Sequence, residues 1–197
     1  MTAEEKDAIL HDETGLRVER VSGRSAFEGN LLHLFCDEVA LPNGDRAVWE
    51  IVRHRGAVCV VPVAENGDVL LVRQFRYPIG KVLLEIPAGK LEEGDEDRAA
   101  AALRELKEET GVCAASLVSL GDFYGAPAYS AERLTLYLAT GLTEGEQKLD
   151  RDEFLRVVRI PLAEAVRLVL DGEIEDMKTQ AGLLRAYLTL QNRTESL

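Results

Sequence analysis

The chain has 197 residues, of which 46% are hydrophobic, and its formal net charge is -12. This length allows one domain, or one domain with an appended element, and the composition allows a real hydrophobic core. The negative charge argues against nucleic-acid binding, which needs basic patches to neutralise phosphates. No apolar run approaches the length of about 18 residues that a membrane span requires.

The first residues and the cysteines indicate the compartment. The chain begins Met-Thr-Ala-Glu-Glu-Lys-Asp, which lacks the basic and apolar regions of a signal peptide. Cys36, Cys59 and Cys113 are odd in number and have no metal-type spacing. We therefore expect reduced core thiols in a cytoplasmic protein.

The N-terminal part of the chain predicts a small sheet. Residues 1–13 are polar, and we expect them to be weakly helical or mobile. Residues 16–21, 31–39 and 46–54 are predicted strands, the last two joined by a hairpin turn at Asn43-Gly44. Three strands with few large side chains bury little by themselves, so we expect a partner surface for this antiparallel sheet.

A second unit is predicted to begin near Gly56. The apolar run 57–63 predicts a buried strand, and Asn66-Gly67 predicts another hairpin turn. The remaining predicted elements are strands at 69–75, 82–86, 117–123, 134–139 and 154–160, and helices at 96–110, 161–170 and 176–191. Strands interleaved with helices in this order predict an α/β sandwich with a mixed sheet between helices. We divide the chain into domains 1–55 and 56–197.

The loop Pro87-Ala88-Gly89 leads into a helix with glutamates at 105, 108 and 109 on one face. Like charges at this spacing repel by roughly 0.2–0.5 kcal/mol per pair. A cation bound by carboxylate oxygens would remove that cost, and Mg²⁺ suits a site that also reaches substrate phosphates. A charged helix is more often just a solvated face. Here the other face is apolar, with Leu103 and Leu106 beside a run of alanines.

The segment from Arg104 to Val112 reads Arg-Glu-Leu-Lys-Glu-Glu-Thr-Gly-Val. It resembles, at every defined position, the second half of the signature of the Nudix hydrolases, which cleave a nucleoside diphosphate linked to another group. The first half departs from that signature. Asp95 stands where the glutamate that follows the glycine by six positions is expected, and one residue too many separates it from Arg104. Counted back from Arg104, Glu96 falls in register, so one inserted residue explains both counts.

Features outside this segment resemble the ADP-ribose pyrophosphatase branch of that family. Pro127 lies sixteen residues beyond Gly111, although a proline in Gly-Ala-Pro also suits an ordinary turn. Three further stretches strengthen the resemblance, which then covers residues 15 to 190: Val72–Pro78, Ile86–Gly89 and Asp176–Thr179. The resemblance implies a homodimer whose subunits exchange N-terminal strands, and a nucleotide-sugar substrate.

The resemblance also implies a nucleotide pocket. Trp49 either stacks on adenine, worth roughly 1–3 kcal/mol in stacking sites, or anchors a core. Glu50 is a candidate acceptor for the adenine amino group. Arg53, Arg73 and Arg76 are candidates for diphosphate or terminal-ribose contacts, and the alternative for any single one is a surface charge.

For the reaction, the resemblance implies metal-assisted hydrolysis to AMP and ribose 5-phosphate, with Mg²⁺ or Mn²⁺ as the metal. The expected metal ligands are Glu105, Glu108, Glu109 and the Ala88 carbonyl, and the expected catalytic set is Glu153, Glu108 and Arg104. Glu153 lies in a long polar loop and is the candidate general base, with Asp152 as its substitute. Alternatives are hydrolysis of another nucleotide sugar such as GDP-mannose, or a non-catalytic nucleotide-sugar sensor.

Overall fold

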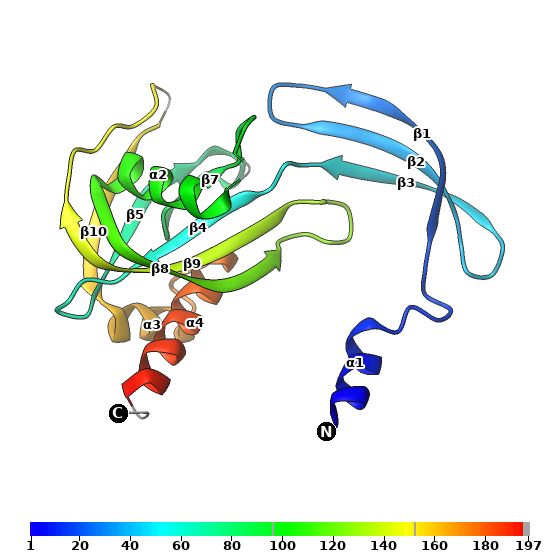
Figure 1. Ribbon diagram of the computed structural model, residues 1–197. Helices are drawn as coiled ribbons and strands as arrows, with labels where there is room; N and C mark the ends of the chain where they lie inside the picture. The colour runs from blue at the N-terminus through cyan, green and yellow to red at the C-terminus, as the bar shows by residue number, and fades with distance from the viewer. Residues whose placement is uncertain (96, 152, 195–197) are drawn as a thin grey trace. The chain divides into compact units, whose positions relative to one another are not determined.

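The computed structural model describes residues 1–95, 97–151 and 153–194 (Figure 1). The chain forms two compact units. The first holds Met1–His54 together with Ala126–Ala131, and the second holds Arg55–Gly125 and the chain from Glu132 onward. The segment 126–131 therefore belongs to the N-terminal unit. The division predicted from the sequence, between residues 55 and 56, assigns this segment to the second domain.

The first unit begins with helix α1 (Ala3–His11). Its start is fixed by a capping box in which Thr2 Oγ1 accepts from the Glu5 N–H and the Glu5 carboxylate accepts from the Thr2 N–H. An antiparallel sheet follows, in the order β1 (Glu19–Glu28), β2 (His33–Ala40) and β3 (Arg46–Arg53). The predicted end of the first strand at residue 21 is wrong. β1 pairs with β2 along its whole length through two irregularities, so its end is set by pairing and not by side-chain alternation.

This sheet buries little of itself, as expected. All residues of β1 are exposed. On the other two strands only Asp37 and Val39 are buried. A three-stranded sheet without a core of its own gains stability when a further surface covers it.

The second unit contains two sheets. Its elements are β4 (Ala57–Pro62), β5 (Asp68–Arg76), the 3₁₀ turn η1 (Tyr77–Ile79), β6 (Lys81–Glu85), β7 (Ala88–Lys90), α2 (Arg98–Thr110), β8 (Val112–Tyr124), β9 (Arg133–Glu144), β10 (Leu155–Pro161), α3 (Leu162–Leu170) and α4 (Met177–Thr194). One sheet has the order β10-β5-β6 and the other β7-β4-β9-β8, and β4 runs parallel to β9. The predicted mixed sheet arrangement is confirmed.

The central strand β4 explains the layering of this unit, because its alternate side chains enter different cores. Val58 and Val60 belong to a cluster with Leu106 of α2. Cys59 and Val61 belong to a second cluster that includes residues of α3 and α4. Helices thus cover both faces, with α2 opposite α3 and α4, and the predicted α/β sandwich is confirmed (Figure 1). Within the described ranges, no helix is long and apolar enough to cross a membrane.

β7, β8 and α2 also differ from the predicted elements. β7 was expected to be loop, but Ala88, Gly89 and Lys90 pair with β4. β8 begins at Val112, ahead of the predicted residue 117, because it pairs with β9 as far as Glu144. α2 begins at Arg98, since the Asp97 carboxylate accepts from two backbone N–H groups of the first turn and so acts as the N-cap.

Candidate active site

Helix α2 holds the predicted glutamates in fixed positions. Its buried face carries Leu106, which is fully buried against β4. At its end Gly111 adopts φ +71°, and its N–H donates to the Lys107 carbonyl. Glycine is the residue that reaches this left-handed conformation without strain, which fits its place at the end of the helix.

Two of the glutamates lean onto β7. Glu109 is 4% exposed, and its Oε2 accepts from the Ala88 N–H at 3.0 Å. A Cβ at Gly89 would lie only 2.0 Å from the Glu105 carboxyl carbon, so the backbone of β7 and this carboxylate share space that no other residue would leave open. The sequence motif Ala-Gly therefore forms a cradle for both carboxylates.

Burial sets the protonation of these groups. The pKa of Glu109 is raised to about 8, chiefly by burial and in smaller part by the Glu153 and Glu105 carboxylates, while the Ala88 hydrogen bond opposes the shift. Burial likewise raises the pKa of Glu105 to about 7, with Arg104 opposing and the Glu108 charge adding to the shift. Glu109 is buried and Glu105 is partly buried, and two such carboxylates with raised pKa values form a site whose charged state a cation would stabilise.

Arg104 connects three acidic side chains of this site. Its guanidinium lies 2.9 Å from Asp95, 2.8 Å from Glu105 and 2.9 Å from Glu108. Asp95, the residue that departs from the family signature, is thereby attached to α2, while Glu96 lies outside the described residues. Arg104 holds carboxylates in place in this structure.

The fit of a metal ion can be judged from these contacts. The partly buried Glu105 against Gly89 and the buried Glu109 against Ala88 offer carboxylate oxygens that could hold a divalent cation. The Glu108 carboxylate is engaged by Arg104. In the part of the chain that the structure describes, no three His, Cys, Asp or Glu side chains already form a metal-binding group. Glu105 and Glu109 therefore fit a metal site, and Glu105 and Glu108 share the Arg104 guanidinium.

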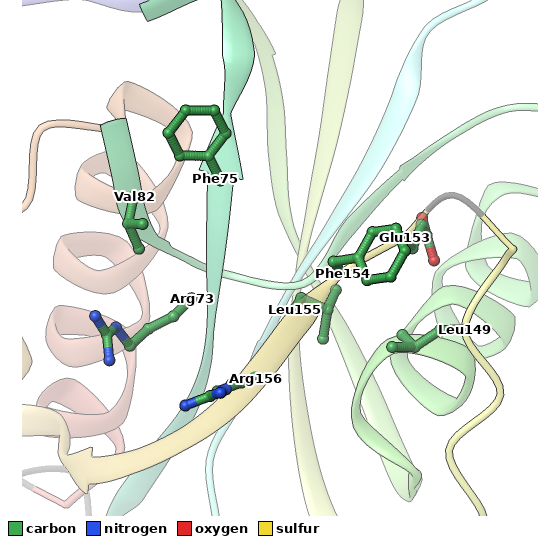
Figure 2. A pocket seen from close by; sticks show the side chains of 8 residues that line it. All are labelled: Arg73, Phe75, Val82, Leu149, Glu153, Phe154, Leu155 and Arg156. Atoms are coloured by element: carbon green, nitrogen blue, oxygen red, sulfur yellow. The ribbon is translucent and has the colours of Figure 1, made fainter. Parts of the chain in front are cut away.

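Glu153 lies close enough to α2 for its charge to raise the pKa values of both Glu105 and Glu109. Glu153 also lines a pocket of about 450 Å³ at the β10-β5-β6 sheet. The other residues of this pocket are Arg73, Phe75, Val82, Leu149, Phe154, Leu155 and Arg156. Figure 2 shows Glu153 at the end of this pocket away from Arg73 and Arg156. Asp152, the suggested substitute, lies outside the described residues.

The two predicted arginines of β5 have different surroundings. Residues three apart on a strand point to opposite faces, so Arg73 and Arg76 cannot face the same partner. Arg76 is the one whose pKa is raised in part by the Glu109 charge, after the larger effect of its bond to Glu85. It binds Glu85 through two hydrogen bonds of 2.7 Å.

A buried ionic group beside Arg76 was missed by the sequence analysis. Glu85 is 1% exposed and also pairs with Lys178, which lies 3.0 Å from Asp176. Thr179 Oγ1 accepts from the Ile86 N–H at 2.9 Å, next to the Pro87-Ala88 segment. A glutamate inside the apolar strand Val-Leu-Leu-Glu-Ile was the available signal, because glutamate is rarely buried without a partner.

The predicted nucleobase residues lie on the first unit. Trp49 is 45% exposed and pairs across the sheet with Asp37, while Glu50 pairs with Cys36. Neighbouring residues of a strand point to opposite faces, so one copy of this sheet cannot bring Trp49 and Glu50 to the same base. Arg53 lies 3.2 Å from Asp37, and its guanidinium stacks 3.8 Å from the Phe35 ring centre.

Pro127 belongs to the turn 126–131. The Tyr129 and Ser130 N–H groups both donate to the Ala126 carbonyl, which forms the turn around the proline. The Val52 N–H then donates to the Tyr129 carbonyl at 2.7 Å, so the turn lies along β3. Pro127 shapes a segment of the first unit, and this is compatible with its reading as a turn residue.

Comparisons with known proteins bear on the family and the fold of this chain. A NUDIX domain model matches residues 53–180. The ADP-ribose pyrophosphatase of Bacillus subtilis (strain 168) is 39% identical over 183 residues, covering 92% of this chain and 97% of that protein. The methanol dehydrogenase activator of Bacillus methanolicus is 39% identical over 184 residues, covering 92% and 95%. The crystal structure of an ADP compounds hydrolase matches with a TM-score of 0.80 at 26% identity, covering 90% of this chain and 96% of that one.

Proposed function

This chain belongs to the NUDIX family, and we propose that it hydrolyses the diphosphate bond of ADP-ribose to AMP and ribose 5-phosphate. The observation that carries this proposal is the pair of carboxylates, Glu105 and Glu109, packed against the Ala88-Gly89 strand. The similarity over 92% of the chain to an ADP-ribose pyrophosphatase supports the choice of substrate.

Hydrolases of this family generally need a divalent metal, and we propose Mg²⁺, with Mn²⁺ as a substitute. When bound, the ion would neutralise phosphate oxygens and lower the pKa of a bound water. Glu105, Glu109 and the Ala88 carbonyl would hold it, and Glu108 would join them. Arg104 would orient the carboxylates and limit their repulsion in the absence of the ion.

Glu153 is the proposed general base. It lies near the Glu105 and Glu109 carboxylates and lines a pocket, which supports its access to a water molecule at the site. A base must come within hydrogen-bond reach of the proton that it accepts. Arg76, whose pKa responds to Glu109, is the arginine that we expect nearest the diphosphate, and Arg73 would serve the pocket beside Glu153.

The first unit is the proposed source of nucleobase contacts. Trp49 would stack on adenine, with Arg53 and the turn at Pro127 nearby on the same unit. Because Trp49 and Glu50 point to opposite faces, a pocket that uses both needs two copies of the sheet. We therefore propose a homodimer in which residues 1–55 mediate association and residues 56–197 catalyse. The three free cysteines favour a cytoplasmic location.

A substrate panel tests the proposal. Purified protein with Mg²⁺ is given ADP-ribose, NADH, diadenosine polyphosphates, GDP-mannose and dGTP, and rates are compared with and without a chelator. We expect ADP-ribose to react fastest, and chelation to stop the reaction. Faster turnover of GDP-mannose would replace the substrate while keeping the mechanism, and tight binding without turnover would establish a sensor.

A further inference from the structure

The C-terminal end of α2 is bonded to the start of the loop that carries Glu153. The last carbonyls of a helix have no partner within the helix. Here the Lys148 N–H donates to the Glu108 carbonyl at 3.0 Å, and the Gly145 N–H donates to the Gly111 carbonyl at 2.6 Å. Between them, Gln147 Nε2 donates to the Glu109 carbonyl at 2.5 Å. The side chain of Gln147 thus completes a set of three bonds.

The close approach of the two backbones depends on glycine. A Cβ at Gly111 would lie 2.9 Å from the Gln147 nitrogen, and a Cβ at Gly145 would lie 3.1 Å from the Gly111 carbonyl oxygen. The glycine that ends α2 therefore leaves room for the loop as well as adopting φ +71°. The loop is seated on the helix by shape as well as by hydrogen bonds.

This attachment limits where Glu153 can be. Four residues lie between Lys148 and Glu153, so the Cα atoms of these two residues are at most about 17 Å apart when the chain is fully extended. On its other side, Leu155 is already paired with Gln74 in the sheet. Two bonds with Asp150 shape the interval: the Glu153 N–H donates to the Asp150 carbonyl, and the Asp150 N–H donates to the Glu153 carboxylate.

We propose that Gln147 is a positioning residue, which latches the loop to the last turn of α2 and so holds Glu153 beside the Glu105 and Glu109 carboxylates. This inference rests on the proposed function, in which Glu153 is the general base. Among the three bonds, the one from Gln147 is the only one made by a side chain, so it can be removed without changing the backbone. Gln147 itself touches neither substrate nor metal in this scheme.

Gln147→Ala and Gln147→Glu test the latch, because the glutamate keeps the length of the side chain but loses the N–H donor. The matched control is Gln180→Ala, since Gln180 Nε2 donates to the Ile174 carbonyl at 2.6 Å, another bond from a glutamine side chain to the backbone. We expect both Gln147 variants to lower kcat for ADP-ribose about ten-fold with little change in KM, as expected of a misplaced base. Gln180→Ala should leave kcat unchanged.

Amide hydrogen exchange provides a readout that does not depend on activity. In Gln147→Ala, the amides of Gly145 and Lys148 should exchange about ten-fold faster than in the wild type, and those of α4 should not change. Unchanged exchange at these amides, or equal kcat in all three variants of an active enzyme, would overturn the latch. If the wild type fails to turn over ADP-ribose but the exchange result holds, the latch stands and the proposed function fails.

Discussion

The two units of this protein both contain antiparallel strands but differ in how much apolar side chain they bury. The second unit buries Leu70, Leu138, Leu106 and their neighbours completely, and its charged site sits on a helix fixed by that core. The first unit leaves Val48, Phe27 and Trp49 substantially exposed and buries only Asp37 and Val39 in its sheet. A packed core holds the carboxylates of α2, whereas the sheet with open faces is suited to binding a nucleotide or another subunit.

The largest effect is expected on kcat, from a change at Glu109 of α2. Glu109→Gln removes a charge that a divalent ion needs, so kcat for ADP-ribose should fall by about a thousand-fold or more. The fold should be retained, because glutamine is neutral and similar in size to glutamate. Burial already favours the neutral form of Glu109, whose pKa is raised to about 8. Steady-state kinetics and thermal melting measure both. Substantial turnover by this variant would show that the metal ligands are assigned wrongly.

Loss of core volume in the second unit comes next. Leu138 is 1% exposed in a cluster between the central sheet and α3 and α4. Leu138→Ala should cost about 2–5 kcal/mol in free energy of unfolding, because it leaves a cavity as well as losing apolar burial. Denaturant unfolding followed by fluorescence gives the value. A cost below about 1 kcal/mol would mean that this core relaxes around the change, which would contradict the contrast between a packed second unit and an open first unit.

Gly111→Ala joins the core and the site at one residue. The new alanine would have to adopt φ +71°, and its Cβ would lie 2.9 Å from the Gln147 backbone nitrogen. We expect a cost of about 1–3 kcal/mol in stability, together with a lower kcat, since the loop that carries Glu153 must shift. Gly172→Ala, at φ +77° with open space around it, isolates the backbone cost from the displacement of the loop. Equal kcat in the two variants would contradict the contact between α2 and the loop.

The pH dependence of the metal-free protein tests the raised pKa of Glu109. The folded pKa of Glu109, about 8, lies above its ordinary value of 4.5, so the fold favours the protonated form. The stability from this group is present below about pH 4.5 and is lost as the pH rises through about 8. Melting temperatures in a chelator should therefore fall between pH 5 and pH 8, and this decline should be smaller in Glu109→Gln. An identical decline in both proteins would remove Glu109 as its source.

The smallest effect on the subunit itself is expected in the open sheet. Val48 is 69% exposed on β3, so Val48→Glu should change the free energy of unfolding of a single subunit by about 0.5 kcal/mol or less. If a second copy covers this sheet, the added charge weakens the dimer, and light scattering should show a larger monomer fraction. An unchanged dimer would place the contact elsewhere, and a monomeric wild type would remove the homodimer.

Local patterns carried the prediction of α2 and its glutamates, because spacing along one helix decides which side chains share a face. The β-strands of the core were also readable from apolar runs such as Ala57–Val63. Long-range contacts were not. The bond from the Ala88 N–H to Glu109 and the pairing of Lys178 with Glu85 join residues far apart in sequence. The role of Gln147 likewise depends on where the end of α2 meets a later loop.

The central claim is that the carboxylates of α2 support metal-dependent hydrolysis of ADP-ribose. The most direct measurement is product analysis by chromatography after incubation of wild-type protein with ADP-ribose, with Mg²⁺ and again with excess chelator. The account predicts AMP and ribose 5-phosphate in equal amounts with Mg²⁺ and neither product with chelator. Equal product formation in both samples, or intact ADP-ribose in both, would contradict it.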